Sequence, residues 1–196
     1  MSLGSSPDRL RERRTEDYAY ILDTFDAESS LAHRRYRGQV AQLMGEKYFI
    51  MLEGLARQSA ELDTSDRVYV GPGSRGKIAV VLRRIAMDDL TAFAKGEIGR
   101  TVEKSISLNE SRWTDVLNTM GSLTPRLHSL QLLPGIGRKM VWAVITEREK
   151  RPFRGFTDFQ MRTRIDPLKT LAKRVRDELA GSQKYYLFVD FYGRKS

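Results

Sequence analysis

Seven consecutive residues have the types and the spacing needed to hold a phosphate group: Leu133, Pro134, Gly135, Ile136, Gly137, Arg138 and Lys139. The proline ends a preceding helix, and the two glycines permit positive φ and the close approach of another backbone. A helix that begins after the second glycine presents free backbone N–H groups at its positive end, which favours an anion. The isoleucine anchors the turn in the core, and the basic pair adds charge beside the anion. The pattern therefore predicts an anion clamp.

Positive charge is concentrated in the same third of the chain. The formal net charge is +9 over 196 residues. Residues 126–196 hold 16 Lys and Arg against 7 Asp and Glu, whereas residues 1–125 hold 18 of each. The sequence therefore assigns any attraction to a polyanion to residues 126–196.

Two helices are predicted to meet at the glycine-rich turn. Thr124 followed by Pro125 has the pattern of an N-cap and first helical turn, and Leu127 and Leu130 then share one face. After the turn, residues 138–150 return to helical apolar spacing. The expected unit is a helix, a Gly-X-Gly turn and a second helix.

This unit closely resembles the helix-hairpin-helix motif of DNA repair, recombination and DNA-uptake proteins. In that family the amides of the hairpin hold a backbone phosphate without reading sequence. The family's functional positions match Gly135, Gly137 and Lys139 here, and its packing positions match Leu133 and Ile136. The resemblance implies that this segment contacts nucleic acid.

A second unit is expected to follow, because residues 147–159 resemble the linker of tandem helix-hairpin-helix proteins. At the place of the second hairpin, residues 164–168 lack both glycines, so this hairpin is predicted to be degenerate. The final helix, predicted over residues 168–179, has basic side chains that we expect to contact flanking phosphates. They are Lys169, Lys173, Arg174 and Arg176.

The N-terminal part has short apolar and aromatic runs separated by turn residues, which is typical of strands. The predicted strands are residues 18–25, 37–44, 47–55, 67–70 and 77–85. So many short strands predict a small antiparallel barrel, with the oligonucleotide-binding (OB) barrel as the leading candidate. Arg35, Tyr36, Arg37 and Tyr48 interleave basic and aromatic side chains and are candidates for contacting a single strand. Aromatic residues on barrel strands also serve as core, and both interpretations stay open.

The predicted fold class is α+β, with four segments. They are a disordered lead-in (residues 1–14), an OB-like β-barrel (15–86), a helical connector (87–120) and an all-α helix-hairpin-helix domain (121–196).

Over nearly its full length the chain resembles an uncharacterised archaeal family of predicted RNA-binding proteins, most specifically in residues 124–158 and 184–189. The resemblance implies RNA rather than DNA as the ligand. It also implies a housekeeping role in transcription, rRNA processing or translation, with transcription or ribosome-associated proteins as further partners.

Several classes of protein are disfavoured by the composition. The chain has no cysteine and two histidines, which argues against disulfides and a zinc site. No apolar run reaches the roughly 18 residues needed to span a bilayer, so we expect a cytoplasmic protein without a membrane partner. No nucleophile with its base and no paired catalytic carboxylates stand out, so we expect no enzyme and no cofactor.

Three alternatives remain open. The first is a DNA-binding repair or recombination protein. The second is a glycosylase-like enzyme, in which Asp158 falls close to the place of the catalytic aspartate that follows a similar hairpin. The third is an adaptor that uses the hairpin to hold a protein of the transcription or translation machinery.

Overall fold

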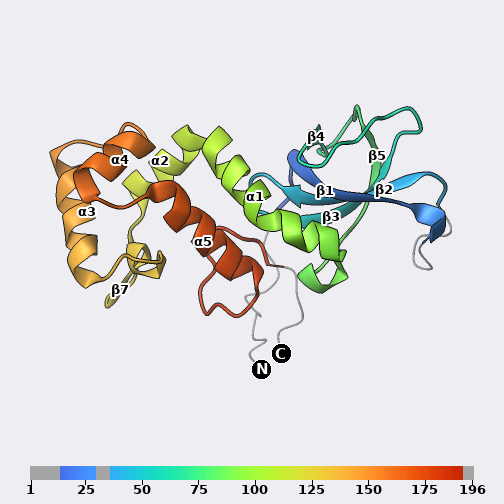
Figure 1. Ribbon diagram of the computed structural model, residues 1–196. Helices are drawn as coiled ribbons and strands as arrows, with labels where there is room; N and C mark the ends of the chain where they lie inside the picture. The colour runs from blue at the N-terminus through green and yellow to red at the C-terminus, as the bar shows by residue number, and fades with distance from the viewer. Residues whose placement is uncertain (1–13, 30–35, 192–196) are drawn as a thin grey trace, which may run out of the picture. The chain divides into compact units, whose positions relative to one another are not determined.

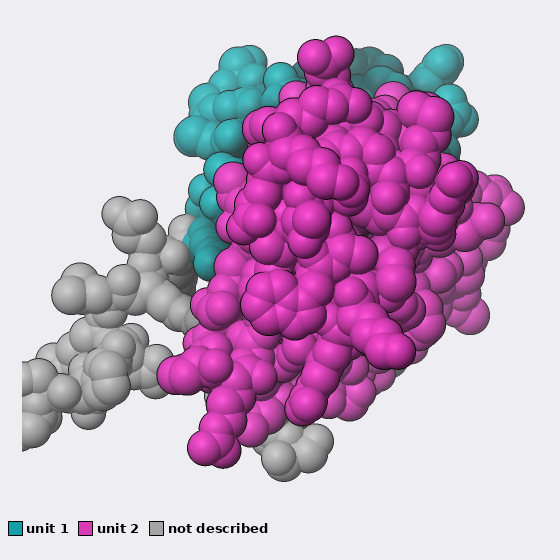
Figure 2. All heavy atoms as spheres, turned by 90° about the vertical axis from the view of Figure 1, so that its left-hand side faces the viewer, with its two compact units in different colours: residues 1–84 teal, residues 85–196 magenta. Residues whose placement is uncertain are grey.

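The computed structural model describes residues 14–29 and 36–191 and combines strands with helices, as predicted. It divides into two compact units, residues 1–84 and residues 85–196 (Figures 1 and 2). The sequence placed the boundary near residue 121 instead. The difference arises because helices expected to form a connector are packed inside the second unit.

Unit 1 is a curled five-stranded antiparallel sheet that forms a half-barrel (Figure 1). Its strands are β1 (Tyr18–Asp26), β2 (Gln39–Gly45), β3 (Met51–Ala56), β4 (Arg67–Tyr69) and β5 (Ile78–Arg84), in the order β4-β1-β2-β3-β5. A short 3₁₀ helix, Ala27–Ser29, follows β1. Inward-facing residues such as Ile21, Leu43 and Ile78 are completely buried and form its core. This architecture is consistent with the predicted OB-like region.

The predicted strands are found close to their expected positions, but β3 begins at Met51 rather than at residue 47. The cause is the buried carboxylate of Glu16, which is 5% exposed. It accepts hydrogen bonds from the backbone N–H groups of Lys47 (2.8 Å), Tyr48 (2.7 Å) and Ile50 (3.3 Å). These amides therefore line a loop around a carboxylate instead of extending the strand.

Unit 2 is built on α1 (Ala92–Leu108), α2 (Glu110–Thr119), α3 (Arg138–Lys150), α4 (Phe156–Thr163) and α5 (Pro167–Leu179). A 3₁₀ helix, Met87–Asp89, precedes α1. Thr91 caps α1 by accepting a hydrogen bond from the N–H of Ala94 at 3.0 Å. The buried face of α1, with Val102 and Ile106, packs against α5, where Leu171 and Val175 are fully buried (Figure 1). This packing places α1 and α2 in unit 2.

The prediction that a helix begins after Thr124 is wrong. Residues in this segment form a two-stranded ribbon, β6 (Ser122–Thr124) and β7 (Leu127–His128), followed by a 3₁₀ helix, Ser129–Leu132. Ser129 closes the ribbon, because its N–H and its hydroxyl both donate to the carbonyl of Gly121, at 2.9 and 2.7 Å. The element before the glycine-rich turn is therefore one short helical turn.

His128 begins this 3₁₀ helix, because its Nδ1 accepts a hydrogen bond from the N–H of Leu130 at 3.1 Å. Burial, together with the charge of Arg148, lowers the pKa of His128. The neutral ring that can accept this bond is thereby favoured. The same Arg148 donates to the carbonyls of Leu117 (3.2 Å) and Met120 (2.7 Å), which ties α3 to the end of α2.

We expect Glu16→Ala to lower the free energy of unfolding by about 2–3 kcal/mol, because three backbone N–H groups lose a charged acceptor. Urea unfolding at neutral pH measures this change. Glu61→Ala, which removes an exposed carboxylate of the same unit, serves as the control and should change stability by less than about 0.5 kcal/mol. Equal stability of the two variants would contradict the assigned role of Glu16.

Candidate nucleic-acid interface

In the glycine-rich turn before α3, Gly135 adopts positive φ, whereas Gly137 has an extended backbone conformation that any residue can adopt. Gly135 has φ of +85°, a left-handed conformation that favours glycine, and the N–H of Ile136 donates to the carbonyl of Leu133 at 3.1 Å. Leu133 and Ile136 are buried, at 1% and 3% exposure, as their predicted packing role requires. The turn is thus fixed from inside and exposes its glycines.

The first turn of α3 lacks a side-chain cap. Gly137 is the N-cap residue, with φ of −79° and ψ of 175°. The first hydrogen bond of the helix runs from the N–H of Val141 to the carbonyl of Gly137 at 3.0 Å. Within residues 14–29 and 36–191, no acceptor is found for the N–H groups of Arg138, Lys139 and Met140. These donors and the positive end of the helix dipole are left for solvent or a ligand.

Space and charge at this helix start also suit an anion. A Cβ atom added to Gly135 or to Gly137 would meet no other atom within 4 Å. The side chains of Arg138 and Lys139 are exposed, and neither forms an ion pair with any described residue. Gly135, Gly137, Arg138 and Lys139 are therefore exposed at this helix start, whereas Ile136 is buried beneath them.

The start of α5 differs in one decisive respect. Asp166 caps it, because its Oδ1 accepts a hydrogen bond from the N–H of Lys169 at 3.1 Å, and Pro167 at the first position has no N–H. The turn between α4 and α5 is made by Arg164, which has φ of +65°. A carboxylate of the chain itself therefore caps the start of α5, the segment where the sequence predicts a degenerate second hairpin.

Three of the basic residues predicted on α5 are exposed but form ion pairs. Lys169 pairs with Asp166 at 3.4 Å, Lys173 with Asp177 at 3.1 Å, and Arg176 with Glu103 at 3.7 Å. Such surface pairs are weak, so these side chains stay accessible to a phosphate. Each cation is nevertheless accompanied by an acid, so α5 does not present the row of free positive charge that the sequence suggested.

The prediction that Arg174 contacts nucleic acid is wrong. The residue is 5% exposed, and its Nε pairs with the Glu178 carboxylate at 2.8 Å. Its remaining nitrogens donate to the carbonyls of Leu132 (3.2 Å) and Tyr185 and to the side chain of Gln183 (3.1 Å). Helical spacing placed Arg174 with its basic neighbours, but it points into unit 2 and holds that unit together.

The candidate residues of the N-terminal part belong to unit 1. Arg35 lies outside the described residues, Arg37 is exposed, and Tyr36 is half-buried. Tyr48 packs against the core of the sheet, and the cations of Arg14 and Lys47 each lie 5.0 Å from its ring centroid. The Tyr48 ring is therefore already engaged within the protein, whereas Arg37 remains open to a ligand.

Unit 1 also contains a hollow of about 410 Å³. Apolar side chains, including Ile50, Leu52 and Val81, line it, and arginines border it. One of these, Arg83, pairs with the buried carboxylate of Glu53 at 2.8 Å. The hollow is therefore mainly apolar, with at least one of its cations neutralised.

Sequence reasoning missed Trp142, which lies on α3 and is 69% exposed. Met140, Val141, Val144 and Ile145 give this segment the apolar spacing of a helix, and Trp142 stands among them as one more apolar residue. In the structure Val141 and Val144 face the core. The sequence does carry a signal for its exposure, because helical spacing places Trp142 outside the apolar stripe that contains Val141 and Val144.

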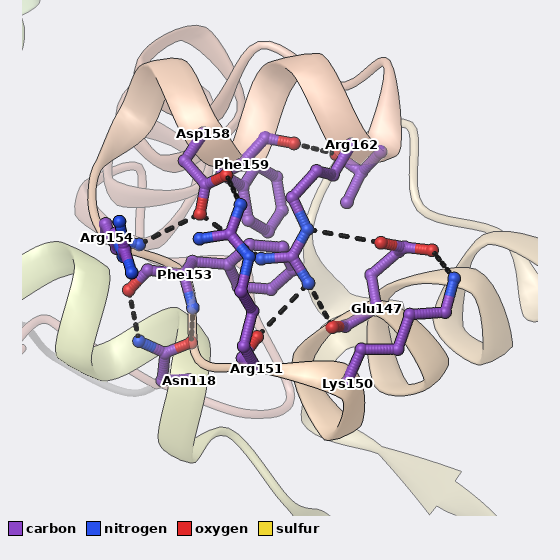
Figure 3. A network of polar contacts seen from close by, with 10 residues as sticks. Asn118, Glu147, Lys150, Arg151, Phe153, Arg154, Asp158, Phe159 and Arg162 are labelled. Carbon is purple, nitrogen blue, oxygen red and sulfur yellow. Dashed lines mark hydrogen bonds and ion pairs between the residues drawn. The ribbon is translucent and has the colours of Figure 1, made fainter.

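Asp158, the aspartate of the glycosylase-like alternative, is held in a network of hydrogen bonds (Figure 3). Its carboxylate accepts from Arg151 (2.9 Å), from the N–H of Arg154 (3.1 Å) and from Arg162 (3.2 Å). Burial raises its pKa, but the hydrogen bonds from Arg154 and Arg162 and the nearby positive charges outweigh burial and hold the pKa below its usual range. This arrangement suits a structural carboxylate better than a general base.

Arg162 is the centre of this network (Figure 3). It pairs with Glu147 at 3.1 Å, donates to the carbonyls of Glu147 and Arg151, and lies 4.5 Å from the centroid of the Phe153 ring. Hydrogen bonds from Lys150 and Arg162 hold the pKa of Glu147 below its usual range. Asn118 of α2 bonds both the N–H (2.8 Å) and the carbonyl (2.9 Å) of Phe153. The segment between α3 and α4 is therefore fixed to both helices and to α2.

Comparison with known proteins identifies relatives over almost the whole chain. Residues 15–190 match the model of a family described as a protein of unknown function, DUF655. The chain belongs to this family. The uncharacterized protein MJ0038 of Methanocaldococcus jannaschii is 34% identical over 185 residues, covering 93% of this chain and 84% of that protein.

The crystal structure of Af1531 from Archaeoglobus fulgidus, assigned to the same family, has a similar fold. Its TM-score is 0.77 at 39% identity, covering 88% of this chain and 99% of that one. The predicted membership of an uncharacterised archaeal family is thus confirmed. Because these descriptions name neither a ligand nor an activity, nucleic-acid binding stays a prediction.

No helix in the described ranges is long and apolar enough to cross a membrane. Among the same residues, no group of three or more His, Cys, Asp or Glu side chains is arranged to hold a metal ion.

We expect Asp158→Asn to lower the midpoint of thermal unfolding at pH 7, because two arginines lose their charged partner. A carboxyl with a depressed pKa stabilises the fold above its unfolded pKa of about 3.8 and loses this effect as the pH falls through the folded value. The difference from wild type should therefore shrink below about pH 4. Thermal scans at both pH values measure this, with Asp115→Asn as an exposed control.

A test of base release from a damaged duplex, carried out on wild type and on Asp158→Asn, addresses the enzyme alternative. If wild type released bases and Asp158→Asn did not, the enzyme alternative would replace the structural role of Asp158.

Proposed function

We propose that this protein binds nucleic acid, RNA in preference to DNA, by holding a backbone phosphate at the start of α3. The observation that carries the proposal is the uncapped first turn of α3, with Arg138 and Lys139 exposed beside it. Backbone N–H groups recognise phosphate oxygens but no base, so binding at this turn is not sequence-specific. The preference for RNA comes from the resemblance to predicted RNA-binding proteins.

The contrast with α5 supports this proposal. Two helices of unit 2 begin after similar turns, but α5 has a carboxylate and a proline at its start, and α3 has two glycines and two cations. The helix-hairpin-helix interpretation requires one open clamp, and α3 supplies it. In this interpretation the OB-like unit adds a second surface, through Arg37 and its neighbours.

A single clamp gives weak binding. A helix start contributes about 0.3–1 kcal/mol toward an anion at an exposed site. Useful affinity therefore requires further contacts on the same molecule of nucleic acid, which raise the effective concentration at the clamp. Lys169 and Lys173 on α5 remain accessible for this purpose.

We expect Gly137→Asp to abolish most binding while leaving the protein slightly more stable. The new carboxylate would cap α3 as Asp166 caps α5, adding about 0.5 kcal/mol to stability. It would also occupy the free N–H groups and repel a phosphate, so affinity for a single-stranded RNA should fall at least about tenfold. Fluorescence anisotropy and urea unfolding measure the two effects.

Gly137→Ala is the matched control, because its backbone conformation suits any residue and a Cβ meets no neighbour. It adds no acceptor, so binding should stay close to wild type. If Gly137→Asp bound as tightly as Gly137→Ala, the phosphate would not lie at the start of α3.

We expect Lys139→Glu to weaken binding about equally for unrelated sequences. Loss of one or two phosphate contacts should reduce the slope of log K against log salt by roughly 1 to 2. Titrations between low and moderate salt, on RNA and DNA of one sequence, measure the slope and the preference together. Lys95→Glu, the same charge change at an exposed site on α1, is the control. If both variants lowered the slope equally, the effect of Lys139 would come from the overall charge of the protein and not from a phosphate held at the start of α3.

A further inference from the structure

Trp142 shares a face of α3 with the basic pair. It follows Lys139 by three residues and Arg138 by four, and residues with these spacings are neighbours on a helix surface. With a rise of about 1.5 Å per residue, the backbone of Trp142 lies roughly 6 Å along the axis from that of Arg138, the first helical residue. A nucleotide adjacent to a phosphate at the start of α3 is therefore within reach of the Trp142 ring.

The indole of Trp142 has no polar or aromatic contact with the residues that the structure describes. It is 69% exposed, and within the described part of the chain it forms no hydrogen bond, ring stack or cation–π contact. By contrast, Trp113 on α2 is 1% exposed and its ring meets Phe188 edge-on, with centroids 5.0 Å apart. Single exposed apolar side chains are common on protein surfaces, so the exposure of Trp142 gains meaning only from its place beside Arg138 and Lys139.

The surroundings of Trp142 favour a nucleobase over a protein partner. A helix that docks into a protein groove repeats apolar residues at positions i+3, i+4 and i+7. From Trp142 these positions are Ile145, which is half-buried in its own unit, and the polar residues Thr146 and Glu149. Toward the start of the helix the neighbours are cations. A lone aromatic ring beside phosphate-binding cations matches the stacking platforms of single-strand binding proteins.

We propose that Trp142 stacks on an unpaired base of the strand whose phosphate is held at the start of α3. This inference rests on the proposed function and specifies its substrate class. In a duplex the faces of each base are covered by its neighbours, so the ring meets an exposed face only in a single strand, a loop or a strand end. The clamp would otherwise accept any backbone, and Trp142 gives it a preference for unpaired nucleotides.

The chain's own tryptophans provide the test. There are two, and the buried Trp113 is shielded, so a change in fluorescence on binding reports Trp142. A single-stranded RNA oligonucleotide should quench this fluorescence, whereas a blunt duplex of the same sequence should quench it much less. In anisotropy titrations, Trp142→Ala should weaken binding of the single strand roughly 5- to 100-fold, and Trp142→Phe should retain most of it.

Phe93→Ala is the matched control, because it removes another exposed aromatic ring, 56% exposed, from α1 of the same unit. Its affinity for the single strand should equal that of wild type. Equal weakening of duplex and single strand by Trp142→Ala would overturn base stacking. If Trp142→Ala changed nothing while Gly137→Asp still abolished binding, this inference would fail and the proposed function would stand. Unchanged binding by both variants would overturn both.

Discussion

The buried ion pair between Arg174 and Glu178 on α5 determines how unit 2 holds together. Arg174 donates to the carbonyl of Leu132, directly before the glycine-rich turn, and Glu178 accepts from the N–H groups of Leu187, Phe188 and Val189 at 2.8–2.9 Å. One pair therefore joins the turn, α5 and the C-terminal segment. Removing one partner of a buried pair leaves an uncompensated charge, so each of these elements depends on the others.

This arrangement separates the structural charges of unit 2 from those open to a ligand. Arg162 and Arg174 are enclosed by acids and carbonyls, and a carboxylate likewise closes the start of α5. At the start of α3, the N–H groups and the cations of Arg138 and Lys139 lack such partners among the described residues. Because these residues are exposed, their N–H groups can be satisfied by water or by a ligand.

The sequence predicted what local patterns determine and missed what distant contacts determine. Alternating apolar residues located the strands, and the φ of +85° at Gly135 follows from its turn. The ribbon at Thr124 was missed because Ser129 closes it through the carbonyl of Gly121. The role of Arg174 was predicted wrongly for a similar reason, since a series of basic residues in the sequence does not show which of them is buried. Trp142 was missed because it stands among apolar residues, although the helical spacing places it off the stripe that Val141 and Val144 bury.

A phosphate clamp and a stacking ring contribute differently to binding. The clamp acts through charge and released counterions, so its share falls as salt rises. Stacking on an aromatic ring depends on contact and desolvation, and so is much less sensitive to salt. In the proposed binding mode only the start of α3 is open, because Asp166 caps the start of α5, so charge alone would leave binding weak and indifferent to the kind of nucleic acid. The proposed stacking on Trp142, one helical turn away and exposed, would supply a contact that persists at physiological salt and separates unpaired from paired strands.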